Sequence, residues 1–279
     1  MRLTLNISPC PNDTFMFEAL INGRIDTRGY EFDVTFVDIE ELNGRVMGGV
    51  TDVTFGGRRG FDGGPDVSKV SYAVLPEIAE RYRLLDSGSA LGHGNGPVLV
   101  ARRGFGRESD FIVSSDFRVA IPGIHTTANM LLQKLFPQLT DRRPMLFSDI
   151  APAIAKGDVD MGVLIHEGRF TYLDHGLELV ADLGVRWDQA MGGLPLPLGA
   201  IVASRSLPPE VVRDVEEMIR ESVEYGFANP AASREFIKSH AQEMDDEVID
   251  NHILLFVNDN SLSLGADARR AVLALTGVK

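Results

Sequence analysis

Cysteine is almost absent from this sequence, with one residue in 279. A single cysteine can form neither an intrachain disulfide nor a cluster of thiolate metal ligands, so nothing points to an oxidising compartment. Long apolar stretches are absent too: no segment reaches the length of a membrane-spanning helix. The N-terminus also lacks the apolar segment and the small-residue cleavage site of a signal peptide. We therefore expect a cytoplasmic protein with no membrane span.

Basic residues are in the minority. The chain has 27 lysines and arginines against 40 aspartates and glutamates, for a formal net charge of −13. A protein that neutralises nucleic-acid phosphates or binds an anionic membrane surface needs clustered basic residues. The composition therefore argues against nucleic acid as a partner. A small anionic ligand remains compatible with it, because the field inside one site need not follow the net charge.

Strand-like runs alternate with helical patterns along the chain. "LTLNI" precedes a helical pattern over residues 14–22, and "EFDVTFV" precedes a short helix that begins in "DIEELN". This alternation predicts an α/β fold. The pattern becomes helical from Pro208 onward, whereas the glycine-rich segment Gly48–Pro65 is weakly periodic and indicates a loop or hairpin. At 279 residues the chain is long enough for two lobes.

The same local arrangement occurs twice: a strand, a tight polar loop, and a helix whose first turn carries hydroxyl or amide side chains. It is found in "NISPCPNDTFMFEAL" and in "VAIPGIHTTANMLLQKL". Unpaired backbone N–H groups and the helix dipole allow such a helix start to hold a carboxylate or a phosphate. The alternative is that both helices are ordinary, with Asp13 and Thr126 acting only as N-caps. Capped helices are the commoner case.

His166 closes the apolar run "VDMGVLIHEG". This position predicts that it lies at the carboxyl end of a strand, where α/β proteins usually place their chemistry. Imidazole titrates near neutrality, so a positioned histidine can act as a general base. The alternative is a hydrogen-bonded core histidine. Strand alternation would place the neighbouring Glu167 on the opposite face.

Six motifs occur together in this chain: "SPCPNDTFMF", "DVSKVSYAVLPEI", "SGSALG", "PGIHTTANMLL", "IHEGRFTY" and "GLPLPLGAI". In this combination and order the sequence resembles the 1,4-dihydroxy-6-naphthoate synthase family, from Leu3 to beyond Asn258. The resemblance implies a two-lobed, periplasmic-binding-protein-like (type II) α/β fold with a ligand cleft between the lobes. With that chain order, residues 1–98 plus 204–279 would form lobe one, and residues 99–203 would form lobe two.

The resemblance also implies a reaction. A carbon–carbon lyase of this family would convert cyclic dehypoxanthinyl futalosine to 1,4-dihydroxy-6-naphthoate and dihydroxyacetone in menaquinone biosynthesis. The partner would be this small anionic substrate, and neither a metal nor an organic cofactor is expected. The sequence gives no indication of an oligomeric state.

The family's site residues can be placed on the matching motifs. His166 corresponds to the proposed general base, and the loop after the first strand would present Asn12 to the substrate. The remaining predicted substrate contacts are Lys69, Val70 and Ser71 of "KVS", and Thr126, Thr127, Ala128 and Asn129 of "TTAN".

The same residues are also compatible with other interpretations. Lys69 could pair with the substrate carboxylate or could be a surface lysine on an edge strand. The glycine-rich segment that precedes it departs from the family pattern, as does "HGNG" after "SALG". A non-catalytic small-anion binding protein or sensor would use the same fold. The third possible function, besides the lyase and the binding protein or sensor, is that of a paralogue acting on a related futalosine derivative.

Overall fold

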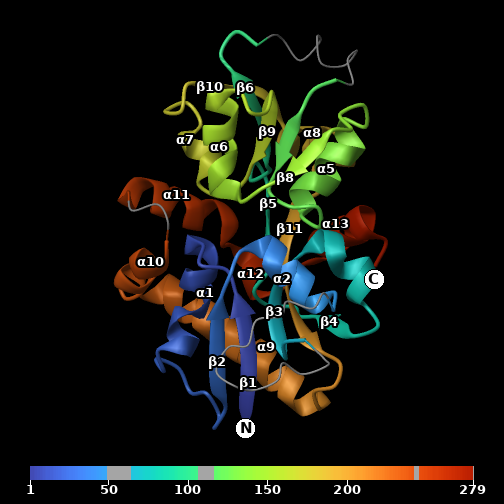
Figure 1. Cartoon of the computed structure of the whole chain (residues 1–279). Helices are drawn as coiled ribbons and strands as arrows, with labels where there is room; N and C mark the ends of the chain where they lie inside the picture. Colours follow the sequence, from blue (N-terminus) through green and yellow to red (C-terminus); the bar gives the residue numbers. More distant parts are fainter. Residues whose placement is uncertain (49–63, 106–115, 242–244, 279) are drawn as a thin grey trace. The chain divides into compact units, whose positions relative to one another are not determined.

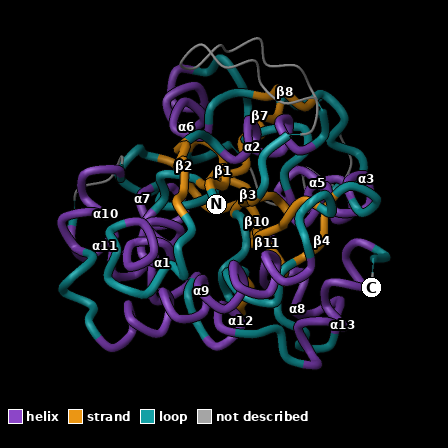
Figure 2. Tube along the Cα trace, turned by 90° about the horizontal axis from the view of Figure 1, so that it is seen from below, coloured by secondary structure: helices purple, strands orange, loops and turns teal. Residues whose placement is uncertain are grey.

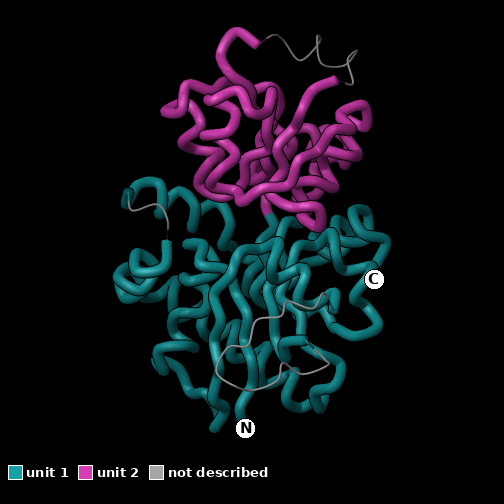
Figure 3. Tube along the Cα trace, in the orientation of Figure 1, with its two compact units in different colours: residues 1–91, 197–279 teal, residues 92–196 magenta. Residues whose placement is uncertain are grey.

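The computed structural model describes residues 1–48, 64–105, 116–241 and 245–278. Most of the predicted excursion Gly48–Pro65 therefore lies outside the described residues. The chain divides into two compact units (Figure 3). Unit 1 consists of Met1–Leu91 and Pro197–Lys279, and unit 2 of Gly92–Leu196. The crossovers follow residues 91 and 196, each seven residues before the predicted 98 and 203.

Unit 1 is built on a six-stranded mixed sheet in the order β2-β1-β3-β11-β4, with β5 also paired to β11 (Figure 1). Strand β1 is parallel to β2 and β3, and β11 is antiparallel to β3 and β4. The second crossover comes before the predicted residue 203 because β11 pairs with β3 and β4. Almost all of β11 therefore belongs to unit 1. The strands are β1 Arg2–Ile7, β2 Glu31–Phe36, β3 Val67–Ser71, β4 Tyr82–Leu84, β5 Ala90–Gly92 and β11 Leu196–Ser204.

Helix α1 is buried along nearly its whole length, because its "FMFEAL" segment is apolar around most of the helix. It packs against α9, α10 and α11 (Figure 2). The helices of unit 1 are α1 Pro11–Ile21, α2 Ile39–Val46, η1 Tyr72–Val74, α3 Leu75–Ile78, α9 Pro209–Ala228, α10 Arg234–His240, α11 Asp246–Phe256, α12 Asp259–Leu262 and α13 Ala266–Thr276. The predicted helical character after Pro208 is confirmed.

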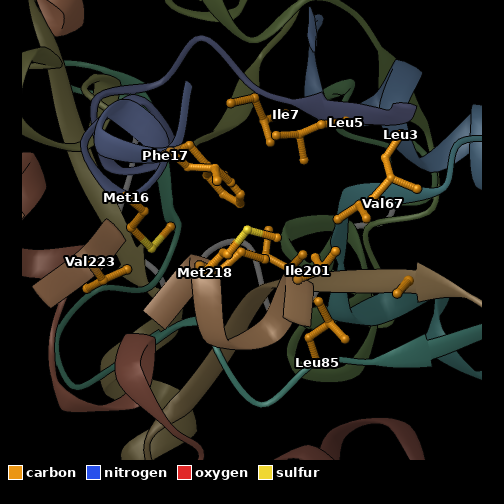
Figure 4. Close-up of a cluster of buried hydrophobic side chains, with 14 of the residues drawn as sticks. Leu3, Leu5, Ile7, Met16, Phe17, Val67, Leu85, Ile201, Met218 and Val223 are labelled. Carbon is orange, nitrogen blue, oxygen red and sulfur yellow. The ribbon is translucent and has the colours of Figure 1, made fainter. Parts of the chain in front are cut away.

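One apolar core joins the sheet of unit 1 to α1 and α9. Figure 4 shows side chains from β1, α1 and α9 pointing into a single cluster. The labelled members from these elements are Leu3, Leu5, Ile7, Met16, Phe17, Met218 and Val223. This packing fixes the start of α1 against the carboxyl end of β1, where the first predicted site motif lies.

Unit 2 contains a five-stranded mixed sheet in the order β10-β6-β9-β7-β8. Strand β7 is parallel to both β8 and β9, whereas β6 is antiparallel to β9 and β10. Its elements are β6 Val98–Arg102, β7 Val119–Ile121, α5 Thr127–Leu135, β8 Arg142–Pro144, α6 Phe147–Lys156, β9 Met161–Leu164, α7 Gly168–Thr171, β10 Leu177–Asp182 and α8 Leu183–Met191. The apolar faces of α6 and of the sheet form the core of this unit. The two sheets with their helices confirm the predicted α/β class.

Within the described parts of the chain, no helix combines the length and the apolar character that a membrane crossing requires.

Candidate active site

Asp13, in the first turn of α1, is completely buried and accepts hydrogen bonds at both carboxylate oxygens. Its Oδ1 accepts from Nζ of Lys69 at 2.6 Å and from Nδ2 of Asn12 at 2.8 Å. Its Oδ2 accepts from the hydroxyl of Ser8 at 2.7 Å and from the backbone N–H of Ser8 at 3.3 Å. We call Ser8, Asn12, Asp13 and Lys69 the Asp13 cluster. The structure thus brings together two of the predicted substrate contacts around a residue that the sequence analysis treated only as a helix cap.

The alternative that Asp13 is the N-cap of the first helix is wrong. The helix begins at Pro11, with Cys10 as its N-cap and without a side-chain cap hydrogen bond. Proline suits the first helical position, because its fixed φ is helical and it has no N–H to leave unpaired. The predicted start at residue 14 was therefore three residues late. Asp13 instead reaches back to Ser8, in the loop between β1 and α1.

Lys69 lies in β3 and is 4% exposed, so its alternative interpretation as a surface lysine on an edge strand is wrong. Strand β3 lies between β1 and β11 in the sheet. Nζ of Lys69 forms a buried ion pair with Asp13. A Cβ added to Gly199 of β11 would come within 2.6 Å of Cε of Lys69, so the lysine occupies the space that a side chain at position 199 would need.

Ser71 ends β3 and is held by Asn43 of α2 at two points. Asn43 donates from Nδ2 to the Ser71 hydroxyl at 3.0 Å, and its Oδ1 accepts from the Ser71 backbone N–H at 2.8 Å. Both residues are buried. Val70, between Lys69 and Ser71, is wholly buried. Asn43 was missed by the sequence analysis, because its partner lies 28 residues along the chain.

The "TTAN" segment begins α5, and Thr126 is its N-cap as the sequence predicted. The Thr126 hydroxyl donates to the carbonyl of Gly123 at 2.9 Å and accepts from the backbone N–H of Asn129 at 3.2 Å. The segment Thr126–Asn129, which we call the α5 turn, is buried. Asn129 donates to the carbonyl of Ile124 at 2.7 Å, but in the described part of the chain its buried Oδ1 has no hydrogen-bond partner. An unpaired buried acceptor costs about 1–3 kcal/mol.

His166 lies two residues beyond Leu164, the end of β9, in agreement with the predicted position at the carboxyl end of a strand. Its φ is 52°, in the left-handed region. Among the described non-glycine residues only Arg28 shares a positive φ. Such backbone conformations cost free energy and are found preferentially at functional sites. The expectation that Glu167 lies on the opposite face of a strand from His166 is wrong. Glu167 is the N-cap residue of α7 and has a helical conformation, so strand alternation has already ended.

The turn that carries His166 is anchored by Arg169 of α7. The Arg169 backbone N–H donates to the carbonyl of His166 at 3.4 Å. Its guanidinium donates from Nη2 to Oδ2 of Asp182 at 3.2 Å and from Nη1 to the carbonyl of Gly96. Asp182 also caps α8. The only sequence signal for Arg169 was its place in the "IHEGRFTY" motif, because its partners are distant in the chain.

In each unit, two adjacent parallel strands carry or lead into the predicted residues. In unit 1, β1 leads into the Asp13 cluster and Ser71 ends β3, which is parallel to β1. In unit 2, β7 leads to the α5 turn and β9 leads to His166, and these strands are also parallel. The carboxyl ends of parallel strands share one edge of a sheet, where α/β proteins commonly bind ligands. Among the described residues, no group of three or more histidine, cysteine, aspartate or glutamate side chains is arranged to hold a metal ion.

Comparison with known proteins agrees with the family resemblance of the sequence. A family model described as "Menaquinone biosynthesis" matches residues 3–56 and 58–278. A 1,4-dihydroxy-6-naphtoate synthase from Thermus thermophilus is 40% identical over 273 residues, which cover 98% of this chain and 92% of that protein.

Two solved structures show the fold. A protein from Archaeoglobus fulgidus has a TM-score of 0.84 at 31% identity, covering 98% of this chain and 95% of that one. The alkanesulfonate-binding protein SsuA from Xanthomonas axonopodis pv. citri has a TM-score of 0.70 at 13% identity, and the match covers 98% of this chain and 90% of that one. The latter likeness concerns the fold alone, and it confirms the predicted periplasmic-binding-protein-like class.

Proposed function

Since the chain belongs to the menaquinone-biosynthesis family that its sequence matches over nearly its whole length, we propose that this enzyme is a carbon–carbon lyase. Its substrate is cyclic dehypoxanthinyl futalosine, and its products are 1,4-dihydroxy-6-naphthoate and dihydroxyacetone. The reaction takes place in the cytoplasm. The observation that carries the proposal is the position of His166, which follows β9 in a left-handed conformation.

His166 acts as the general base in this proposal. A neutral imidazole can take a proton from carbon or from a hydroxyl at cytoplasmic pH. The left-handed conformation of its backbone and the anchoring of the next turn by Arg169 support a fixed position for the imidazole. A base held in place contributes more to the rate than one that must be oriented during each turnover.

The α5 turn binds an anionic group of the substrate. Helix α5 begins at Thr127, and its first-turn N–H groups and its dipole favour a negative charge there. Thr126, Thr127, Ala128 and Asn129 supply the contacts of this turn. The unpaired Oδ1 of Asn129 provides an acceptor for a hydroxyl of the substrate.

Asn12, Lys69, Val70 and Ser71 supply further contacts. Because Lys69 is already paired with Asp13, the Asp13 cluster offers hydrogen-bond donors with little net charge. This charge balance favours contact with uncharged oxygen atoms of the substrate over contact with its carboxylate. Val70, whose side chain is fully buried, contributes through its backbone and through packing.

The test is incubation of the purified protein with cyclic dehypoxanthinyl futalosine, followed by mass spectrometry for the naphthoate and for dihydroxyacetone. The proposal requires both products in equal amounts. Binding of the substrate without either product would favour the alternative, a non-catalytic binding protein or sensor, because the fold alone does not decide between these functions. Turnover only of a related futalosine derivative would identify a paralogue.

A further inference from the structure

Asp13 is an unusual residue to find in the core of unit 1. Its carboxylate is 0% exposed and is paired with an ammonium group that is itself buried. Removing two charges from water costs several kcal/mol for each ion, and well-packed apolar residues at such positions are often as stabilising as the ion pair. Stability therefore gives little reason for a charged pair at this position.

The partners of Asp13 suggest a different reason. Its Oδ1 binds Nδ2 of Asn12, the preceding residue in α1, and Nζ of Lys69 in β3, 56 residues from Asp13 in the chain. Both partners are substrate contacts in the proposed function. We propose that Asp13 is a positioning residue that holds Asn12 and Lys69 in place for substrate binding, an inference that rests on that function.

The arrangement requires a carboxylate. All the groups that Asp13 meets are donors: an ammonium, an amide NH₂, a hydroxyl and a backbone N–H. An ionised carboxylate is an acceptor at both oxygens, whereas an asparagine has one acceptor and one NH₂ group. An Asp13→Asn side chain has nearly the same shape, but it would turn a donor toward either Ser8 or Lys69. The substitution therefore disrupts the cluster with little change in volume.

The same helix provides a matched control. Glu18 is also buried, at 2% exposure, and also binds a cation, with Nε of Arg24 at 2.6 Å from its Oε1. The same oxygen also accepts from Nδ2 of Asn22 at 3.1 Å. Neither partner is a predicted substrate contact. Glu18→Gln thus removes a buried carboxylate from α1 and leaves the Asp13 cluster intact.

The experiment measures kcat, KM and thermal unfolding for the wild type, Asp13→Asn and Glu18→Gln. A lost hydrogen bond to a charged group predicts a KM raised about 10- to 100-fold in Asp13→Asn, with a smaller change in kcat. Glu18→Gln should keep the wild-type KM even where its unfolding temperature falls. A folded Asp13→Asn protein with wild-type KM, beside an active wild type, would overturn the inference. An inactive wild type would instead contradict the proposed function.

A second measurement does not depend on turnover. Crystal structures of the ligand-free wild type and Asp13→Asn should show Nζ of Lys69 and the amide of Asn12 displaced by about 1 Å, a shift that can cost about 100-fold in rate. Unchanged positions of both groups would overturn the inference. If Asp13→Asn does not fold, Asp13→Glu replaces it in both measurements, because it keeps the charge but lengthens the side chain by one methylene.

Discussion

The ring of Phe147 meets the imidazole of His166 edge-on, with ring centroids 5.1 Å apart and an interplanar angle of 66°. Phe147 is the first residue of α6, so this contact joins the helix to the turn after β9. An edge-to-face pair fixes ring orientation as well as distance. The orientation of the proposed base therefore depends on a residue 19 positions earlier in the chain.

Replacing Phe147 with Leu should lower kcat and leave KM nearly unchanged. An aromatic pair contributes about 0.5–1.5 kcal/mol beyond its buried area, which corresponds to a loss of about 2- to 10-fold in kcat. Phe227→Leu is the matched control, since it removes the tilted pair with Phe15, at 5.9 Å, in unit 1. Steady-state kinetics of both variants check the prediction, and an equal loss of kcat in the two would contradict it.

His166→Gln should lose about 10² to 10⁴ in turnover, the usual contribution of a general base, and should still bind the naphthoate. The substitution leaves the α5 turn and the Asp13 cluster in place. Single-turnover assays measure the rate, and calorimetric titration with the naphthoate measures binding. Near-normal turnover by the folded variant would refute the assignment, and His125, beside the α5 turn, would be tested next.

Gly199→Ala should raise KM, because its new Cβ would lie 2.6 Å from Cε of Lys69 and displace the lysine from Asp13. Gly44→Ala, in α2, provides the comparison: apart from its chain neighbours and the backbone of its own helix, its Cβ would meet no atom within 4 Å. Alanine at position 44 should preserve KM and stabilise the protein slightly, since alanine is the better helix former. Kinetics and thermal unfolding of the two variants test this. A Gly199→Ala enzyme with unchanged KM would show that Lys69 does not need its present position.

Asp160→Asn should lower the free energy of unfolding near neutral pH and leave it unchanged in acid. The hydrogen bond from the Arg118 side chain lowers the pKa of Asp160. The ionised pair therefore stabilises the fold above the ordinary aspartate pKa, and this stabilisation is lost as the pH falls through the lowered value. Urea unfolding from about pH 7 to pH 2 should show the wild-type and variant curves converging in acid.

Asp267→Asn, at an exposed pair with Arg270, is the control for the pH experiment. Exposed pairs contribute about 0–1 kcal/mol. Its unfolding free energy should stay close to that of the wild type across the whole range. A constant difference between Asp160→Asn and the wild type at every pH would contradict the assigned role of the Arg118 pair.

Local patterns in the sequence were sufficient to predict the α/β class, the helical C-terminal part and the cap at Thr126. Each of these depends on residues that are close together in the chain. The apolar run before His166 was sufficient to predict its position after a strand, and the resemblance to a family added its role as the general base. The left-handed conformation of His166 was not predictable, because it depends on where pairing of β9 ends and α7 begins.

The relations that were missed join distant residues. Asp13 and Lys69 are 56 positions apart, and the parallel pairing of β1 with β3 brings them together. The predicted second lobe, residues 99–203, includes all of β11 but its last residue, whereas the structure places Pro197–Lys279 in unit 1, because an apolar run does not reveal which sheet it joins. Its partner β3 lies more than 120 residues earlier in the chain.

The place of β11 in the sheet order β2-β1-β3-β11-β4 has a consequence during synthesis on the ribosome. Strands β3 and β4 are made early, but they are not neighbours, and the strand that separates them begins only at the last residue of unit 2, Leu196. Unit 2 emerges complete while unit 1 still lacks an interior strand. The nascent chain must therefore keep the β3 edge from pairing wrongly until β11, near the start of the final third of the protein, has been translated.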